Sequence, residues 1–451
     1  AYLLVLMGSI MINYLTGLGM FYEQNTRRRQ RIFVLGIVLN LLLLIIFKYT
    51  NFAFNNVNVL TNIFGLEPIY VNTIILPLGI SFYTFKAITY LVSIVGEEKV
   101  PRTNIADFAL YLAFFPQVIA GPIDRYNVLL PQIKNRTISI QKFTSGVKRF
   151  TLGLVKKVII SSPLAYVADQ IFSRPIDDLS TPVVWLGAIS YTLQVYYDFS
   201  GYTDMAIGLG RLFGFEFSEN FNFPYISRSI REFWVRWHIT LSTWLRDYLF
   251  LPLAYSSYKK LEKGEYLGIR KDTVTYIYAT TITFLLCGMW HGAAWTFIIW
   301  GLTHGLLLSL EKTGFGIWME KRFRPLGHIY FLLSIVLTFV IFRSSTLSQA
   351  FGLLGIMFGI GGRVVYWPEM LEYLDREYIT MLIIAIAGST TIFVNILNKI
   401  NSRTQYRLTG MRHVVHYGSS IVMILGILMA LFFVTLTLVS VTNNSFIYFK
   451  F

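Results

Sequence analysis

Cysteine is nearly absent from this chain of 451 residues, since Cys287 is the only one. A disulfide within the chain is therefore excluded, and so is a metal site built from several thiolates. Disulfide-stabilised secreted folds and zinc-ribbon proteins are thereby ruled out. A single thiol gives no information on the redox state of the compartment.

Charged residues are also scarce. Asp, Glu, Lys and Arg make up 14% of the chain, against about 25% in soluble domains, whereas 55% of the residues are hydrophobic. Because a soluble fold cannot hide so much apolar surface, the composition predicts an all-α polytopic membrane protein. We expect about ten to twelve transmembrane helices plus re-entrant or interfacial helices. They form one membrane-embedded domain over residues 1–451, and the start at Ala1 within an apolar run suggests that the native N-terminal segment is missing.

Apolar runs of spanning length occur along the whole chain. They lie at residues 1–22, 32–49, 73–95, 182–197, 272–289, 292–310, 326–342, 379–398 and 417–440. Shorter or polar-interrupted runs lie at 105–123, 150–171, 201–216, 233–254 and 347–361. A run broken by proline and glycine is often re-entrant, which predicts that 105–123 turns back at Pro116 and Gly121.

The excess of basic residues, a net charge of +15, is concentrated in short segments between the apolar runs. These segments lie at 27–31, 134–149 and 259–271. Such loops are typical of the cytoplasmic side and of contact with anionic lipid headgroups, and no soluble basic domain exists to bind nucleic acid. The segment 50–72 has no Lys or Arg and is expected to be an extracytoplasmic loop.

Common catalytic motifs are missing too. The sequence contains no GxxxxGK[ST], no HExxH and no GxSxG, and Gly208-Leu209-Gly210 lacks the rest of a dinucleotide fingerprint. A metal site built from Asp198, Asp204 and histidines lacks ligand spacing, so no bound metal is expected.

The first candidate site lies in the polar segment 198–247, which follows an apolar run. A helix over 233–248 would place one aromatic and aliphatic stripe opposite a polar face. The stripe is Phe233, Trp237, Leu241, Trp244 and Tyr248, and the polar face is Arg236, Thr240, Thr243 and Asp247. His238 would lie at the edge of the stripe. An interfacial anchor with snorkelling arginines is the alternative interpretation.

The second candidate is His291, which lies between two apolar runs where ionisable groups are costly and usually face a cavity or a partner. Imidazole is suited to removing a proton from a hydroxyl. Gly288 and Gly292 leave room for a ligand or another backbone. A packed histidine with an interhelical hydrogen bond is the alternative. His304, thirteen residues later, would lie on the opposite face of an unbroken helix and is expected to be a packing residue.

Five stretches of the sequence resemble the membrane-bound O-acyltransferases, and in particular the branch of alginate O-acetylation membrane proteins. They are Leu76–Phe85, Phe115–Ile123, Tyr197–Asp204, Arg231–Asp247 and Met289–Gly292. The resemblance extends over most of the chain. It implies tilted and broken helices around a central tunnel, in a multi-pass protein of the bacterial plasma (inner) membrane.

The resemblance also implies the chemistry. Acyl transfer from a thioester to a hydroxyl would use His291 as the catalytic histidine and His238 as a second functional histidine. The donor would be acetyl coenzyme A or an acyl carrier, used as substrate, with no tightly bound cofactor. An envelope polysaccharide or an extracytoplasmic relay partner would accept the acetyl group. The expected substrate-binding residues are Asp198, Tyr202, Asp204, Arg236, Trp237, Arg246, Asp247 and Trp290.

Three other functions stay open from the sequence. A sister branch transfers D-alanine towards teichoic acids, although it usually ends soon after the histidine block, whereas this chain continues with apolar runs to residue 440. Ionisable residues in spans also suit a transporter of polysaccharide or acyl groups. A scaffold that only recruits an acetylating partner would function without His291.

Overall fold

The computed structural model describes residues 2–96, 104–316, 324–361, 366–396, 398–399 and 412–440. The regular secondary structure of these residues is helical, apart from one small antiparallel hairpin of β1 (Glu265–Tyr266) and β2 (Ile269–Arg270). Its two central residues, Leu267 and Gly268, both have positive φ, as a tight two-residue hairpin turn requires. The predicted all-α class is therefore confirmed.

The chain divides into two compact units. The first comprises Ala1–Val147, Ala206–Ser218 and Gly292–Ala294, and the second comprises Lys148–Met205, Glu219–His291 and Trp295–Phe451. The boundary falls inside two long helices, because α6 (Ile140–Leu154) and α8 (Thr181–Leu212) contribute residues to both units. That the chain forms a single domain around a central tunnel stays a prediction.

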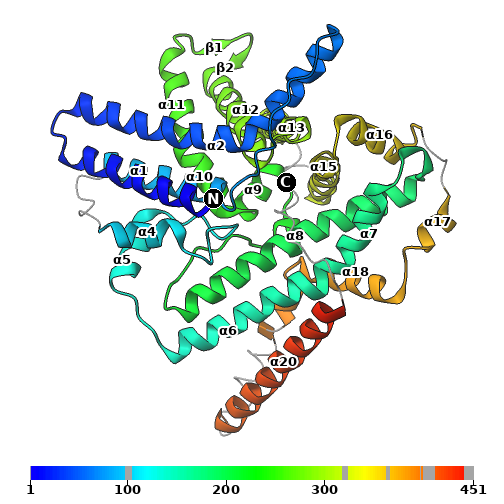
Figure 1. Cartoon of the computed structure of the whole chain (residues 1–451). Helices are drawn as coiled ribbons and strands as arrows, with labels where there is room; N and C mark the ends of the chain where they lie inside the picture. Colours follow the sequence, from blue (N-terminus) through cyan, green and yellow to red (C-terminus); the bar gives the residue numbers. More distant parts are fainter. Residues whose placement is uncertain are drawn as a thin grey trace. The chain divides into compact units, whose positions relative to one another are not determined.

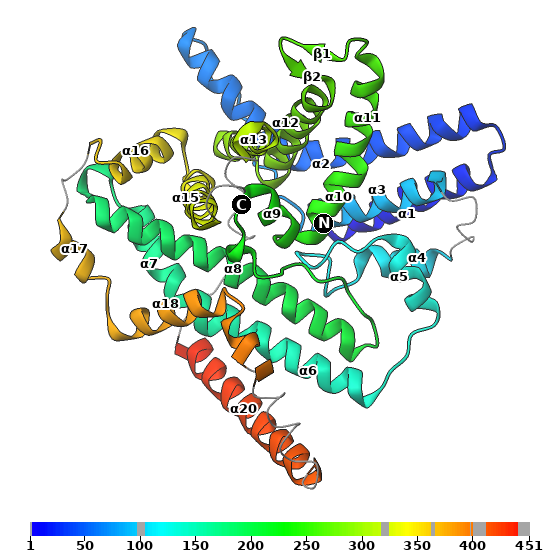
Figure 2. The same cartoon turned by 180° about the vertical axis from the view of Figure 1, so that it is seen from behind.

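The first unit begins with α1 (Tyr2–Tyr22) and α2 (Thr26–Ile63), which run side by side in both views (Figures 1 and 2). A buried pair of amides joins them: Asn13 Nδ2 donates to Asn40 Oδ1 at 3.1 Å, and Asn40 Nδ2 donates to Asn13 Oδ1 at 2.7 Å. In an apolar setting such reciprocal bonds satisfy groups that lipid cannot.

Helix α2 is longer than the predicted span 32–49, because it continues to Ile63. The prediction of a loop at 50–72 is therefore wrong for its first part. Two side chains explain the extension. Asn51 exchanges hydrogen bonds with the backbone of Ile74, and Asn58 does the same with Ile69, so the chain that follows α2 lies along it.

Helix α3 (Ile80–Gly96) begins later than the run at 73–95, since the residues before it are not helical. Gly79 sets its start: φ is +76°, and a Cβ there would lie 2.2 Å from the carbonyl oxygen of Val118. Helix α4 (Ile105–Ala113) has nine residues, about 14 Å by the helical rise, and gives way to turns at Phe114. The 105–123 run is thus broken as predicted, and α5 (Tyr126–Lys134) follows. Re-entry into the bilayer stays a prediction.

A buried polar chain ties α3 to the turn after α4. Lys86 Nζ donates to Gln117 Oε1 at 2.8 Å, and Gln117 Nε2 donates to Asp124 Oδ2 at 2.7 Å. Tyr111 Oη adds a bond to the Asp124 carbonyl at 3.1 Å. Because the cation and the carboxylate are linked through an amide, none of these buried groups is left without a partner.

The second unit continues α6 through a π-helical turn η1 (Val155–Ile160) into α7 (Ser161–Ser173), and a short 3₁₀ turn η2 (Ile176–Asp178) leads to α8. Helix α8 joins two predicted runs, 182–197 and 201–216. Helices α12 (Lys271–His291) and α13 (Trp295–Lys312) form a hairpin, beside which α15 (Arg324–Arg343) packs (Figure 1).

Shorter helices complete the second unit. They are the 3₁₀ turn η3 (Pro224–Ile226), α9 (Ile230–Arg236), α10 (Ile239–Leu245), the π-helical η4 (Arg246–Phe250), α11 (Leu251–Lys260), α16 (Leu347–Met357), α17 (Trp367–Leu371), α18 (Arg376–Gly388) and the long α20 (Arg412–Ser440). Helix α18 is shorter than the run at 379–398, which partly lies outside the described residues.

Six helical stretches of the described residues are long and apolar enough to cross a membrane. They are Tyr2–Tyr22, Thr26–Ile63, Ile140–Ser173, Lys271–His291, Pro325–Arg343 and Ser420–Val439. The protein is thus a multi-pass membrane protein by composition and helix length. The number of ten to twelve spans stays a prediction.

The orientation from loop charge gives a direct prediction. Arg28 at the start of α2 and Lys260 at the end of α11 are exposed and should both face the cytoplasm. Cysteines at these positions, with Cys287 replaced, should resist an impermeant thiol reagent in intact cells and react after permeabilisation. Labelling of either cysteine from outside would contradict the orientation.

Candidate active site

His291 is the last residue of α12, and its half-buried ring lies in a box of three aromatic side chains. The ring centroids of Trp290, Trp300 and Phe342 lie at 4.9, 5.0 and 5.3 Å, each nearly perpendicular to the imidazole. Three helices contribute to the box, because Trp300 belongs to α13 and Phe342 to α15. The imidazole is thus held in one orientation by packing, as a preorganised catalytic group requires.

Glycines bring the α12 and α13 backbones together beside His291. A Cβ on Gly288 would lie 2.3 Å from the carbonyl oxygen of Phe297, and a Cβ on Gly301 would lie 2.2 Å from that of Phe284. Of the two alternatives considered for Gly288, room for a ligand or for another backbone, the second is therefore correct. This close approach fixes where α12 ends and where its last residue points.

His238 lies in a break between two helices, and the predicted continuous helix over 233–248 is wrong. Helix α9 ends at Arg236, His238 has left-handed backbone angles of φ 43° and ψ 52°, and α10 starts at Ile239. The aromatic stripe and the polar face expected on one helix are therefore divided between separate helices. A left-handed non-glycine residue is uncommon and is often found where surrounding contacts impose it at a functional site.

Asn220 provides those contacts. Its Oδ1 accepts from the backbone N–H of Thr240 at 3.1 Å, from the Thr240 hydroxyl at 2.9 Å, and lies 3.2 Å from His238 Nδ1. A backbone N–H can only donate, so the atom that faces it must be the amide oxygen. His238 Nδ1 must then donate as well, which assigns the proton to Nδ1.

The other ring nitrogen of His238 is consequently a lone-pair acceptor. Nε2 is buried and has no hydrogen-bond partner among the described residues. Burial also lowers the pKa of His238 below its ordinary value, so the ring stays neutral near neutral pH. The site therefore presents a neutral imidazole nitrogen in a buried setting, ready to accept a hydrogen bond from a ligand.

Both histidines contact the same indole. Trp290 lies 4.9 Å from His291 and 6.4 Å from His238 between ring centroids. Phe199 of α8 also packs on His238, at 4.7 Å. The structure thus brings together two histidines that are 53 residues apart in the sequence. This pairing is the geometry expected if both act on one reacting group.

The carboxylates of the 197–204 motif are bound to cations of the neighbouring helix. Asp198 pairs with Lys157. Asp204 receives Arg149 Nε at 2.8 Å on one oxygen and Lys156 Nζ at 2.7 Å on the other. The predicted basic loop at 134–149 is wrong for its second half, because Arg149 lies inside α6.

Glycines allow α8, which carries Asp198 and Asp204, to lie close to the helix that carries the cations. A Cβ on Gly201 would lie 2.8 Å from the Gly153 carbonyl, and a Cβ on Gly153 would lie 2.5 Å from that of Gly201. Two of the three cations come from the π-helical turn η1, a distortion often found at functional sites. The carboxylates therefore stabilise buried positive charge, and a direct role of Asp198 or Asp204 toward a substrate stays a prediction.

The other predicted substrate-binding residues are distributed more widely. Arg236 donates to Glu232 at 3.0 Å and to the Asn222 carbonyl at 3.2 Å, so it braces the loop before α9. Trp237 is buried and stacks on Phe233 at 5.2 Å. These two residues hold the backbone around His238.

Arg246 and Asp247 pair with each other at 2.7 Å in η4, and the Arg246 side chain is 58% exposed. Tyr202 is half-buried in α8, one turn from Asp198. Among the described residues predicted to bind substrate, Trp290 is the one whose ring packs against both histidines.

Sequence reasoning did not identify Asn220, Trp300 or Phe342 as parts of the site. Asn220 lies in a polar stretch that was noted for its composition, but its link to His238 depends on tertiary folding. His304, expected to be a packing residue, is fully buried, and its Nδ1 accepts from Trp234 Nε1 at 3.3 Å. Its ring also packs on Trp300 at 4.8 Å, so it supports a wall of the His291 box.

Comparison with known proteins identifies similar membrane-bound acyltransferases. A family model described as the membrane-bound O-acyltransferase family matches residues 1–348, a range that contains both histidines. A probable alginate O-acetylase AlgI of Azotobacter vinelandii is 43% identical over 360 residues, which cover 80% of this chain and 68% of that protein. A peptidoglycan O-acetyltransferase of Helicobacter pylori is 34% identical over 425 residues, covering 87% and 77%. A teichoic acid D-alanyltransferase of Bacillus subtilis is 30% identical over 274 residues, covering 58% and 65%.

Proposed function

Because the chain belongs to the membrane-bound O-acyltransferase family, we propose that it carries an acetyl group from a cytoplasmic thioester to a cell-envelope polysaccharide or to a relay partner. The donor is acetyl coenzyme A or an acetylated acyl carrier, and the membrane is the bacterial plasma membrane. The observation that carries the proposal is the placement of His291 and His238 against one indole, that of Trp290.

In the proposed reaction His291 acts as general base. Its imidazole removes the proton of the acceptor hydroxyl, the hydroxyl oxygen attacks the thioester carbonyl, and a new oxygen–carbon bond replaces the carbon–sulfur bond. The thiolate leaves and takes up the proton from His291. The lone pair of His238 Nε2 accepts a hydrogen bond from the acceptor or the donor and orients it.

The choice of acetyl over D-alanyl transfer rests on how much of this chain aligns with each kind of relative. The two acetylating relatives align with 80% and 87% of this chain, whereas the D-alanyl transferase aligns with 58%. A transporter or a scaffold without chemistry of its own is disfavoured, because neither role needs an imidazole fixed in an aromatic box at a helix end.

The test is thioester turnover by the purified chain in detergent or nanodiscs. Release of free thiol from acetyl coenzyme A or acetylated carrier protein is expected, with acetyl ester formed on a glycan or on the relay partner. Turnover of a D-alanyl carrier alone, or no turnover of any thioester, would refute the acetyl-transfer proposal. Mass spectrometry of envelope polysaccharides from cells with and without the protein identifies the acceptor.

A further inference from the structure

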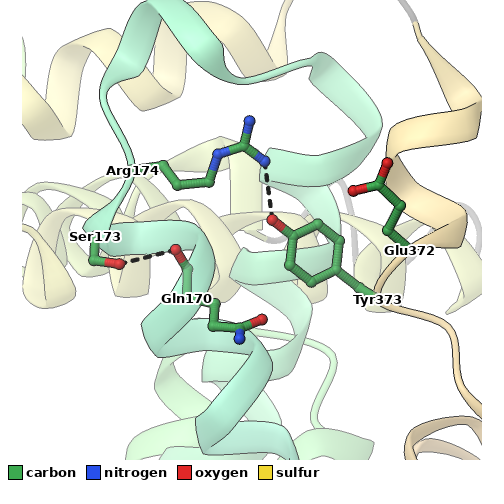
Figure 3. A pocket seen from close by; sticks show the side chains of 5 residues that line it. All are labelled: Gln170, Ser173, Arg174, Glu372 and Tyr373. Atoms are coloured by element: carbon green, nitrogen blue, oxygen red, sulfur yellow. Dashed lines mark hydrogen bonds between the residues drawn. The ribbon is translucent and has the colours of Figure 1, made fainter.

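An open, polar surface cavity of about 380 Å³ lies in the second unit, away from the histidine pair in sequence, and Gln170, Ser173 and Glu372 are exposed at it. Its lining side chains are Gln170, Ser173, Arg174, Glu372 and Tyr373. The first three come from the end of α7, and the other two directly follow α17 (Figure 3). All five carry polar groups, whereas most small-molecule pockets are mainly apolar. A ligand with many hydroxyl groups suits this lining.

One side of the cavity is rigid. Arg174 donates to Tyr373 Oη at 2.9 Å (Figure 3). It also donates to the Asp178 carbonyl at 2.7 Å and pairs with Glu369 at 2.7 Å. Because the guanidinium is used in three directions, it holds α17 against α7 and is not free to bind an acidic group.

The other side offers hydrogen-bonding groups to a ligand. The amide of Gln170 and the carboxylate of Glu372 make no hydrogen bond with the described residues, and Ser173 uses its hydroxyl only to donate to the Gln170 carbonyl at 3.0 Å. The cavity thus presents one amide donor and several acceptor oxygens, the set that sugar hydroxyls use well.

Contacts made by the end of α15 link His291 to the helix that lines the cavity. Phe342, which packs on His291, precedes Arg343, the last residue of α15. Arg343 donates to Asp169 Oδ1 at 2.6 Å, and Asp169 is adjacent to Gln170 in α7. A continuous set of contacts therefore connects the end of α12 to the cavity.

The charge around the cavity differs from that of the chain. Residues 174–178 and 369–377 carry six carboxylates and two guanidinium groups, a local charge of −4 in a chain of net charge +15. Segments poor in Lys and Arg are typical of the extracytoplasmic side of a membrane protein. An acidic surrounding also repels an anionic polymer.

We infer that this cavity binds a neutral sugar unit of the acceptor glycan on the extracytoplasmic side, and that it discriminates against uronic-acid polymers. The inference rests on the proposed acetyl transfer and names the class of its acceptor. It separates this chain from its alginate-related relatives in the sugar that is recognised, because Glu372 and its acidic neighbours oppose a carboxylated sugar.

The experiment compares two probes on the full purified chain. A neutral N-acetylglucosamine tetrasaccharide and a tetra-uronate of the same length are titrated at low salt, with binding followed by saturation-transfer NMR. The neutral probe should bind at least tenfold more tightly, and added salt should reduce this difference. Equal or tighter binding of the uronate, or binding of neither probe, would overturn the inference.

Substitutions of the cavity residues test whether the glycan binds in this cavity. Glu372→Gln should reduce the tenfold preference to less than threefold, whereas the matched change Glu377→Gln on exposed α18 should leave it unaltered. Ser173→Trp should fill the cavity and abolish binding of the neutral probe, and Gln170→Ala should weaken it at least threefold without adding bulk. Binding that is insensitive to both α7 variants places the sugar elsewhere and refutes the cavity as its site.

Thioester turnover by the wild-type chain reports separately on the proposed function. Turnover without binding of the neutral glycan refutes the cavity inference alone. Glycan binding without thioester turnover refutes acetyl transfer alone.

Discussion

Replacement of His291 by alanine should reduce acyl transfer by about 10²–10⁴-fold, the usual contribution of a general base, or roughly 3–5 kcal/mol of activation free energy. His291→Gln should be equally inactive, because glutamine keeps much of the size and hydrogen bonding of the imidazole but cannot take a proton. The measurement is thiol release and ester formation per folded molecule, with folding followed by the size-exclusion profile. Both variants should elute as the wild type does, since the ring is only half-buried at the end of α12.

A packing role for His291 gives the opposite pattern. Glutamine would then restore function, and alanine would lower the yield of folded protein while leaving the rate per folded molecule intact. Activity of His291→Gln above about a tenth of wild type would therefore exclude the general-base role. His304 is a useful comparison, because it is fully buried and bonds to Trp234. Its replacement should act first on folding.

The sequence predicted the helical membrane class of the protein and the positions of several of its helices, whereas the site residues stay a prediction. Low charge and long apolar runs indicate membrane helices wherever they occur, because the bilayer imposes length and composition on each helix separately. The helices that carry His291 and its neighbours were placed to within a few residues for this reason: the predicted runs 272–289 and 292–310 correspond to α12 and α13.

The prediction of a continuous helix over 233–248 was wrong, because the break at His238 depends on a residue that is distant in the sequence. The spacing of Phe233, Trp237 and Leu241 suits a continuous helix, yet Asn220 binds Thr240 and His238 and holds the chain in a left-handed turn. Local periodicity contains no information on a contact eighteen to twenty residues away. The same limit applies to α2, whose extension depends on the side-chain amides of Asn51 and Asn58, which bind the backbone of the segment that follows the helix.

The ion pairs of Asp198 and Asp204 were missed for a related reason. Their partners Lys156, Lys157 and Arg149 lie 41 to 55 residues earlier, in what reads as a basic loop followed by an apolar run. Charge patterns indicate which side of a membrane a segment faces, but they do not reveal which cations turn inward. The close packing of Gly153 against Gly201 lets the helix that carries these cations approach the helix that carries the carboxylates.

Replacement of Gly301 by alanine should disrupt the helix pair that holds His291. The added Cβ would lie 2.2 Å from the Phe284 carbonyl oxygen and 3.1 Å from the Gly288 Cα, and backbone atoms cannot turn aside as a flexible side chain does. Overpacking in a well-packed interior costs roughly 1–3 kcal/mol, and relief here requires α13 to move away from α12. Trp300, the neighbouring residue, would then shift from the imidazole of His291.

The expected result is a loss of both thermal stability and rate. Displacement of the reacting group by about 1 Å is enough to lower a rate roughly 10²-fold, so Gly301→Ala should show that loss per folded molecule together with a lower unfolding temperature. Gly305→Ala is the matched control one turn along the same helix. A Cβ at position 305 would lie 3.4 Å from Thr281 Cα and 3.5 Å from Phe284 Cβ, which are ordinary van der Waals distances. That substitution should be neutral or slightly stabilising, by up to about 1 kcal/mol, because alanine favours helix over glycine.

Comparison of the two glycine variants tests how the α12–α13 hairpin positions the His291 side chain. If close backbone approach at Gly301 is what places His291, then Gly301→Ala and Gly305→Ala must differ in rate although both add one methyl group to the same face of α13. Equal activity and equal unfolding temperatures for the two variants would show that the hairpin adjusts without loss. The orientation of His291 would then depend on its aromatic box alone, and Phe342→Ala, which opens that box from α15, should reduce the rate in place of Gly301→Ala.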